Sequence, residues 1–236
     1  MTKLLTTNTK LEKDSKEYLA LGLQLAPHKQ AGMGNVCPDA SEGCKTSCLF
    51  SAGRGAFNNV IQGRVNRTKL FFQDQKGFMT LLFKEIKSGK VKAIKENKKL
   101  AIRLNTISDI AWERIKIEGK SVFESFPDIQ FWDYTKSPSR MSAFLAGEMP
   151  KNYHLTFSRS ESNQKIVESI VASGGNIAAV FRGELPKTYL GKSVFSGDSS
   201  DLRFKDPKGV IIGLVQKGKA KQDKTGFVLE PNEGVN

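Results

Sequence analysis

The three cysteines of the chain, Cys37, Cys44 and Cys48, are the residues best suited to chemistry, because all of them fall within twelve residues. Their spacing is C-x6-C-x3-C, in a segment that also carries Pro38 and several glycines. Structural cysteines are scattered through a core, whereas cysteines clustered in a turn-rich loop indicate a metal or redox site. Turn residues can bring the sulfurs onto one point. We therefore expect the loop to present three thiolates to a metal.

The segment around and after these cysteines is basic. Between Gly43 and Gln73 there are five Lys or Arg residues and no acidic residue. Nearby positive charge favours the thiolate form of cysteine, which is the form that binds metal. The sequence therefore predicts thiol pKa values below the ordinary value.

The number of cysteines leaves the identity of the metal open. A [4Fe–4S] cluster normally takes four cysteines, so three would leave one iron free for a substrate or small ligand. A closed zinc site needs a fourth protein ligand, and His28, Asp39 or Glu42 could supply it. In a third interpretation the cysteines are merely structural, or two of them form a disulfide. An odd number argues against a disulfide scaffold.

Length and composition are those of one soluble globular domain spanning residues 1–236, with 39% hydrophobic and 26% charged residues. No apolar run is long enough to span a bilayer, so no membrane partner is expected. The first ten residues lack the apolar region of a signal peptide. We expect a cytoplasmic protein, in which thiols stay reduced. The oligomeric state is left open.

The formal net charge of +13 is the strongest compositional feature. It favours a polyanionic partner such as nucleic acid, or a phosphorylated nucleotide. The alternative is a lysine-rich surface that is simply solvated, and the seven lysines between positions 84 and 99 fit that interpretation. No known nucleic-acid-binding module is recognisable in the sequence.

The order of predicted elements indicates an α/β fold. Residues 1–17 are polar and are expected to be flexible, and a long helical region with breaks at Gly77 and Gly89 is expected over 58–97. Strands are expected at 18–25, 100–104, 129–133, 153–157, 176–181, 193–195 and 209–215. Short helices are expected at 111–118, 122–126, 139–147 and 164–172. Strands alternating with helices imply parallel pairing, and six or seven such units predict a partial (β/α) barrel.

Polar residues follow the predicted strands in a consistent way, and the cysteine loop follows the first strand. The residues that would meet at the carboxyl ends of the strands, where barrels build active sites, are Asn105, Ser108, Asp109, Asp133, Ser158, Glu161 and Arg182. Asp109, Glu161 and Asp133 are the candidates for catalytic carboxylates. Asn105, Ser108, Ser158 and Arg182 are candidates for cofactor binding. The alternative is that Asp and Ser after a strand cap the next helix.

Several motifs give the chain a resemblance to a known family. They are C-P-x-A-S-x-G-C-x-x-x-C-L-x-x-A-G-R-G, R-L-N-x-x-S-D-I-x-W-E, Y-T-K and Y-H-L-T-F-S-R-S-E-S-N. With them the chain resembles phage proteins of the gene-product-88 type. More remotely, the order of motifs is similar to phage proteins related to radical S-adenosylmethionine enzymes. That resemblance implies that Cys37, Cys44 and Cys48 ligate a [4Fe–4S] cluster in a radical-SAM-like barrel. The open iron would then chelate the methionine part of S-adenosylmethionine.

The function expected from these observations is a phage-type iron–sulfur enzyme acting on a nucleotide or nucleic acid. One alternative is a zinc-stapled protein that binds nucleic acid without catalysis. Another is a cluster-independent, base-modifying barrel enzyme with Asp109 or Asp133 as nucleophile. Arg54, between two glycines at the end of the cysteine loop, is expected to face Asp109 across the barrel mouth and to bind the carboxylate or phosphate of a ligand. A simple Arg54–Asp109 ion pair is the alternative there.

Overall fold

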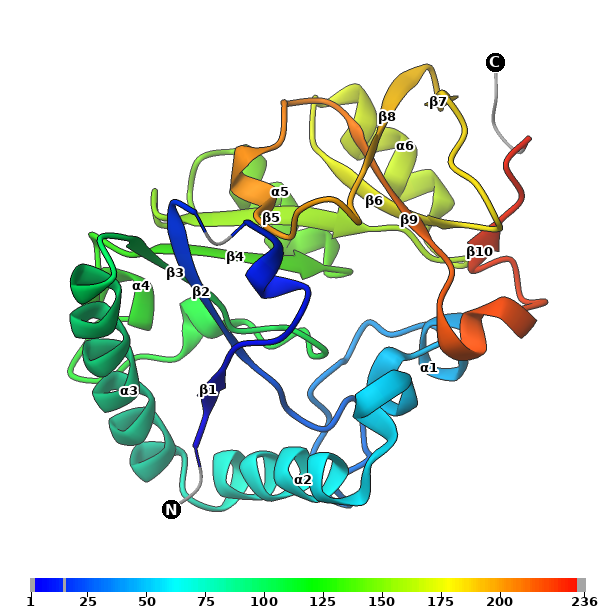
Figure 1. Ribbon diagram of the computed structural model, residues 1–236. Helices are drawn as coiled ribbons and strands as arrows, with labels where there is room; N and C mark the ends of the chain where they lie inside the picture. Colours follow the sequence, from blue (N-terminus) through cyan, green and yellow to red (C-terminus); the bar gives the residue numbers. More distant parts are fainter. Residues whose placement is uncertain (1–2, 15, 233–236) are drawn as a thin grey trace.

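The computed structural model describes residues 3–14 and 16–232 of the chain, and its centre is one ten-stranded sheet (Figure 1). The strands are β1 (Leu5–Thr6), β2 (Tyr18–Leu23), β3 (Lys99–Arg103), β4 (Gln130–Thr135), β5 (Tyr153–Ser158), β6 (Ile177–Phe181), β7 (Thr188–Tyr189), β8 (Lys192–Ser196), β9 (Ile211–Val215) and β10 (Val228–Leu229). Their order is β1-β2-β3-β4-β5-β6-β9-β8-β7, and β10 pairs with β6.

Parallel pairing runs through the whole centre of the sheet. Only the outermost pairs, β1 with β2 and β7 with β8, are antiparallel. In the described part of the chain no pairing joins β1 to β7. The α/β class and the mostly parallel sheet are therefore confirmed, whereas the sheet is open and does not close into a barrel. Because β9 pairs along all of β6, β10 takes the other edge of β6, beyond the point where β5 ends its pairing.

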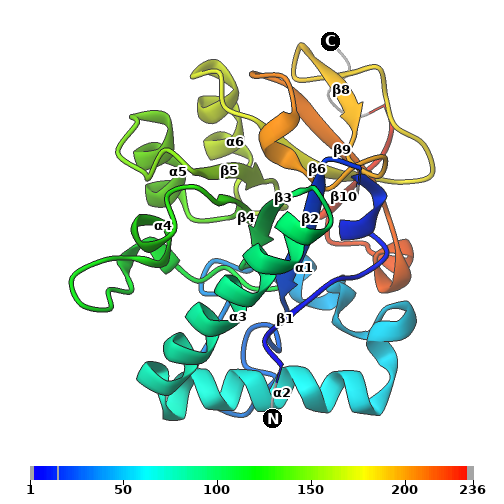
Figure 2. The ribbon, with the colours of Figure 1, turned by 60° about the vertical axis from the view of Figure 1, so that its left-hand side comes forward.

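Helices follow the strands as the alternating pattern predicts, except at 111–118, where only a short 3-10 helix over Trp112–Arg114 forms. The α-helices are α1 (Glu42–Thr46), α2 (Asn58–Gln73), α3 (Gln75–Lys95), α4 (Val122–Ser125), α5 (Pro138–Leu145) and α6 (Gln164–Ala172). The 3-10 helices are η1 (Leu11–Asp14), η2 (Leu49–Ser51), η3 (Gly53–Ala56), η4 (Trp112–Arg114), η5 (Arg203–Lys205) and η6 (Gly218–Gln222). Figure 2 shows α3, α4, α5 and α6 on the same side of the sheet. No helix in the described residues is both long and apolar enough to cross a membrane.

The long helical region breaks at a different residue from the one predicted. Asp74 separates α2 from α3, and its carboxylate accepts a hydrogen bond from the Gly77 backbone at 2.8 Å, which caps α3. Gly89 lies inside α3 rather than at a break. A Cβ at Gly89 would come within 2.9 Å of Leu21 in β2, so the missing side chain lets the helix lie close to the sheet.

The described part of the N-terminal segment makes contacts with the sheet and α3. Leu4 and Leu5 are buried in the main core, and Leu5 pairs with Leu23 of β2. Glu85 of α3 accepts hydrogen bonds from the backbone N–H groups of both leucines, at 2.8 and 2.7 Å. The flexibility expected for residues 1–17 stays a prediction.

Candidate functional site

The cysteine loop lies between the end of β2 and the start of α2, and its three thiols are all half-buried. Cys37 precedes α1, Cys44 lies within α1, and Cys48 directly precedes η2. The Sγ of Cys37 accepts a hydrogen bond from the His28 backbone N–H at 3.3 Å. Its thiol also points at the Ile107 carbonyl, 3.7 Å away, in the loop that follows β3. Cys37 therefore joins the ends of β2 and β3.

Burial dominates the acid–base behaviour of these thiols. It raises the pKa of Cys37 to about 12, and the negative charges of Cys44, Cys48 and Asp109 raise that pKa further. Burial also raises the pKa of Cys48, although the positive charges of Lys136 and of Arg64 in α2 oppose this rise. The prediction of lowered thiol pKa values is thus wrong for Cys37 and Cys48, because desolvation outweighs the basic surroundings. These effects also show that the three sulfurs lie within electrostatic reach of one another.

Glu161, a predicted catalytic carboxylate, holds the cysteine loop in place. Its two carboxylate oxygens accept hydrogen bonds from the Gly43 backbone at 2.7 Å and from the Ser41 hydroxyl at 2.8 Å. Ser41 in turn caps α1 through the backbone of Cys44. Glu161 follows β5, so this contact spans the rim of the sheet from β5 to the loop after β2. Both carboxylate oxygens of Glu161 therefore hold the cysteine loop in position.

Arg64 holds the other end of the loop from α2. Its guanidinium donates to the Phe50 carbonyl at 2.7 Å and to the side chain of Gln24 at 2.9 Å. It also lies over the Phe50 ring, 5.5 Å from the centroid. Gly55 makes this approach possible, because a Cβ there would come within 2.8 Å of the Phe50 carbonyl oxygen and within 3.1 Å of Arg64.

The C-terminal segment, residues 216–230, packs against the same loop. Cys44 lies against an apolar cluster of Ala220, Phe227 and Val228. Arg182, a predicted cofactor-binding residue, anchors this segment: it donates to the Asp223 carbonyl at 2.9 Å and forms an ion pair with Glu230 at 2.6 Å. Figure 1 shows η6, in orange-red, beside α1. The structure thus places Arg182 behind the segment that covers Cys44.

Gly43 sits where the loop, Glu161 and the C-terminal segment meet, and we expect Gly43→Ala to lower stability by about 1–3 kcal/mol through overpacking. A Cβ there would lie 2.6 Å from the Cβ of Phe227 and 2.9 Å from Oε2 of Glu161. Gly63→Ala on α2 is the matched control, since its nearest neighbour would be 3.8 Å away. We expect the control to be neutral or slightly stabilising. Equal denaturant midpoints for the two variants would contradict the close packing.

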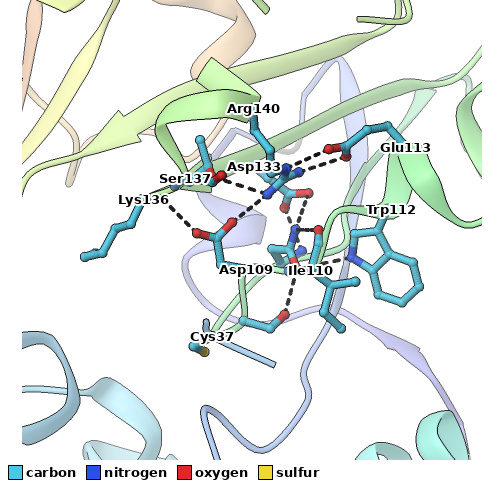
Figure 3. A network of polar contacts seen from close by, with 12 residues as sticks. Cys37, Asp109, Ile110, Trp112, Glu113, Asp133, Lys136, Ser137 and Arg140 are labelled. Atoms are coloured by element: carbon cyan, nitrogen blue, oxygen red, sulfur yellow. Dashed lines mark hydrogen bonds and ion pairs between the residues drawn. The ribbon is translucent and has the colours of Figure 1, made fainter. Parts of the chain in front are cut away.

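Asp109 belongs to a buried network centred on Arg140, which Figure 3 shows from close by. Arg140 Nη1 contacts Asp109 Oδ1 at 2.5 Å, and its Nε and Nη2 donate to the two oxygens of Glu113 at 2.8 and 3.1 Å. Nη2 also donates to the Tyr153 hydroxyl at 2.7 Å. The second Asp109 oxygen accepts from the Lys136 backbone at 2.7 Å. Burial raises the pKa of Asp109, and the Arg140 charge opposes the rise.

Asp133 and Asn105 form the other half of this network. The Asp133 carboxylate accepts from the Asn105 backbone at 2.6 Å and from the Tyr153 hydroxyl at 2.9 Å. Asp133 is fully buried, and burial raises its pKa to about 7. The Asn105 side-chain oxygen accepts from Ser108, at 2.8 Å, and from Trp112, at 3.1 Å. These residues therefore shape the loop after β3 and hold Asp109 in place.

The structure does not pair Arg54 with Asp109. Arg54 is exposed on η3, and its guanidinium makes no ion pair with the described residues. Asp109 instead contacts Arg140 and the backbone of Lys136. The backbone N–H of Asp109 donates to the Val36 carbonyl at 2.7 Å. The alternative interpretation, a simple Arg54–Asp109 ion pair, is therefore wrong, whereas ligand binding by Arg54 stays a prediction. Asp109 reaches the cysteine loop through its backbone.

Comparison with known proteins gives one match that covers nearly the whole chain. The profile of the family described as gene product 88 matches residues 2–231. The chain belongs to the gene product 88 family. No curated protein and no solved structure matches it. The resemblance to gene product 88 proteins is thus confirmed, whereas nothing in these comparisons supports the likeness to radical S-adenosylmethionine enzymes.

Lys136 lies at the same rim in this gene product 88 protein, although it was not among the predicted site residues. Its ammonium donates to the Ser158 hydroxyl at 2.8 Å and lies over the Phe227 ring, 5.6 Å from the centroid. Its charge lowers the pKa of Cys48. Lys136 therefore joins β4, β5, the C-terminal segment and the cysteine loop. The Y-T-K motif at the end of β4 was the available signal.

The cysteine loop of this family member does not form a ready site for a single metal ion. Within residues 3–14 and 16–232, no three His, Cys, Asp or Glu side chains are arranged to hold one ion. A structural zinc site draws four donors to within about 2.3 Å of one point. His28, the predicted fourth zinc ligand, contacts Cys37 through its backbone, and its ring nitrogen Nε2 lies 3.4 Å from the Gln30 amide.

Proposed function

We propose that Cys37, Cys44 and Cys48 hold a [4Fe–4S] cluster at the rim of the sheet, with one iron left open to a small ligand. The observation that carries the proposal is that three half-buried thiols lie in one loop at one rim of the sheet. A cluster binds each cysteine through a different iron, so its ligands stand farther apart than the ligands of one ion.

The surroundings of the thiols support a cluster as well. Hydrogen bonds to the sulfurs and partial burial are among the features with which a protein tunes such a cluster. Here the His28 backbone donates to Cys37, and all three thiols are half-buried. With the pKa of Cys37 at about 12, the thiol holds its proton at neutral pH, so metal binding must release it. We expect cluster assembly to become easier as the pH rises.

When bound, the open iron would offer a coordination position to an amino-carboxylate ligand such as the methionine part of S-adenosylmethionine, which supplies radical chemistry. The order of these segments along the chain supports a radical-SAM-like arrangement. The cysteine loop follows β2, the Asn105–Asp109 loop follows β3, Ser158 ends β5 and Glu161 follows it. The substrate class that we propose is a nucleotide or nucleic acid, because the net charge is +13.

The chain's own residues have distinct tasks in this proposal. Lys136 brings a positive charge near Cys48 and offsets the negative charge that builds up when thiolates form. Glu161 and Arg64 fix the two ends of the cysteine loop. Asp109 and Asp133 act as positioning residues, since their carboxylates are held by the Arg140 and Asn105 contacts. This use of both carboxylates makes a nucleophilic role, as in the cluster-independent alternative, the weaker hypothesis.

Metal analysis of protein purified without oxygen tests the cluster. We expect about four irons and as much acid-labile sulfide per chain, together with visible absorbance that disappears in air. A colourless protein with one zinc per chain would contradict the cluster and support the zinc-stapled alternative.

An exposed patch beside the cysteine loop favours nucleic acid as the partner. We define this loop patch as Leu49, Arg54, Phe57, Lys219 and Lys221, all of which are exposed. Its two halves touch, because η2 contacts η6 and a Cβ at Gly218 would lie 3.0 Å from Ala52. Basic side chains bind phosphates, and an exposed aromatic ring can stack on a base of a single strand.

Changing Lys219 and Lys221 together to alanine should weaken binding of single-stranded DNA and reduce its salt dependence. Each lost phosphate contact lowers the log–log salt slope by about 0.7 for a single strand, so the double variant should lose about 1.4. The matched control is the double variant of Lys84 and Lys87, which are exposed on α3. Figure 1 shows α3 on the opposite side of the molecule from η6. Fluorescence anisotropy at several salt concentrations measures the slopes. Equal slopes for the two double variants would contradict the loop patch.

A further inference from the structure

The face of the sheet that turns away from helices α3–α6, here called the inner face, carries buried polar side chains beside two small apolar clusters. Along β5, Tyr153, Leu155 and Phe157 belong to the main core, whereas His154 and Thr156 point to the opposite face. The polar and aromatic residues of the inner face include Arg103 of β3, Trp132 and Tyr134 of β4, and His154 and Thr156 of β5. The segment 198–206 covers it, and η5 within that segment contacts both β4 and β5.

Buried polar atoms without partners are concentrated at this face. Eight buried side-chain nitrogen or oxygen atoms in the described residues have no hydrogen-bond partner. All eight belong to the inner face or to its cover: Arg103 Nε, Trp132 Nε1, Tyr134 OH, His154 Nε2, Thr156 Oγ1, Arg203 Nε, Arg203 Nη1 and Asp206 Oδ2. Native proteins leave few buried polar atoms unpaired, so such a concentration calls for a bound polar group.

These atoms lie close together rather than along the whole sheet. Trp132 pairs with His154 and Tyr134 pairs with Thr156 in the β4–β5 register. The Arg103 guanidinium lies 4.6 Å from the centre of the Tyr134 ring. Arg203 belongs to η5, which contacts both β4 and β5, so the cover lies over these two strands. Trp132 and Thr156 are fully buried, and Arg203 is 1% exposed.

The chemistry of the unpaired atoms identifies the kind of group that would satisfy them. The nitrogens of Arg103, Trp132 and Arg203 can only donate, whereas Asp206 Oδ2 alone can only accept. Asp206 Oδ2 already lies 3.2 Å from Arg203 Nη1 as an ion pair. Tyr134 OH, Thr156 Oγ1 and His154 Nε2 can donate or accept, so they could also pair with water. A group with several acceptor oxygens would satisfy the donor-only nitrogens directly.

The charge of the donors favours an oxyanion. Asp201 is shared between Arg103, at 2.9 Å, and Lys10, at 3.1 Å, and Asp206 forms an ion pair with Arg203. Two of the atoms without a hydrogen-bond partner, Arg103 Nε and Arg203 Nε, belong to guanidinium groups. Charged donors of this kind form stronger hydrogen bonds with an oxyanion than with a neutral group.

We infer that the inner face binds a small ligand through an oxyanion, a carboxylate or a phosphate, held by Arg103, Trp132 and Arg203. Tyr134 and Thr156 contribute hydroxyl groups that can donate or accept. This site continues to the cysteine loop, because Lys136 and Ser158 come next on the same face of β4 and β5. It does not depend on the metal proposed above, since no cysteine takes part in it.

Thermal unfolding of the full chain in phosphate and in acetate, at constant ionic strength set with chloride, tests the inference. We expect at least one of the two anions to raise the Tm of the wild-type protein, and the arm that responds distinguishes phosphate from carboxylate. Thr156→Val and Tyr134→Phe each remove one unpaired hydroxyl with little change of shape. We expect each variant to unfold near the wild-type Tm in chloride but to bind the anion about tenfold more weakly.

Thr68→Val is the matched control, because the buried Thr68 hydroxyl is fully used: it donates to the Arg64 carbonyl at 2.9 Å and accepts from the Ala26 backbone at 2.8 Å. We expect this variant to lose Tm in chloride but to keep the full response to the anion. The triple Cys→Ser variant should also keep the response, whether or not the wild-type protein contains iron. No rise in the wild-type Tm with either anion would overturn the inference. So would an undiminished response in Thr156→Val and Tyr134→Phe, or a response lost with the cysteines.

Discussion

Arg140→Met is expected to cost about 3–5 kcal/mol of folding free energy, since it removes one partner from a buried ionic network. Arg140 is 2% exposed and contacts Asp109, Glu113 and Tyr153 at 2.5–3.1 Å. Methionine keeps most of the aliphatic volume but leaves two carboxylates without their cation. A buried charge without a partner is far more costly than the loss of one exposed ion pair.

Urea unfolding at fixed pH measures this effect, and Arg114→Met is the matched control. Arg114 belongs to η4, next to Glu113 in sequence, but its side chain is exposed. Exposed substitutions of this kind usually change stability by less than about 0.5 kcal/mol. A loss below about 1 kcal/mol for Arg140→Met would show that the network is not a major source of stability. Because the Asp109 backbone also bonds to Val36, the variant should load less iron in addition.

The central strands and their carboxyl-terminal rim could be predicted from the sequence. Each parallel strand is a short apolar run followed by polar residues and then by a helical pattern, so β2 to β6 and α6 lie close to the predicted ranges. The rim followed from topology, since parallel strands end at the same edge. Clustered cysteines marked the loop after β2. These patterns are local, and they predict the elements because apolar residues recur at a different spacing in a helix and in a strand.

The long-range contacts of the site could not be predicted in this way. Arg64 and Arg140 lie on helices, where an arginine usually points into solvent, yet both are buried against loops far along the chain. The 216–230 segment is rich in lysine and carries little periodic pattern, although it packs against Cys44. Pairing of β10 with β6 depends on where β5 stops, which is a property of the assembled sheet.

Loss of bound iron in the cysteine variants is the second large effect that we expect. Changing any one of Cys37, Cys44 or Cys48 to serine is expected to reduce cluster-bound iron from about four per chain to nearly none. A serine oxygen is a hard ligand that is protonated at neutral pH, and two remaining thiolates cannot hold a cluster that already lacks a fourth cysteine. Iron and sulfide content after anaerobic reconstitution measures the loss.

His28→Asn separates the cluster from the zinc alternative. His28 has a φ of 39°, a left-handed conformation that asparagine tolerates well. Its backbone N–H, which donates to Cys37 Sγ, is kept in the variant. A cluster held by three cysteines should therefore bind iron as in the wild-type protein. A zinc site with an imidazole as fourth ligand should instead lose its metal in His28→Asn as completely as in the cysteine variants. If the cysteines are only structural, neither kind of variant changes the metal content, and the cluster proposal fails.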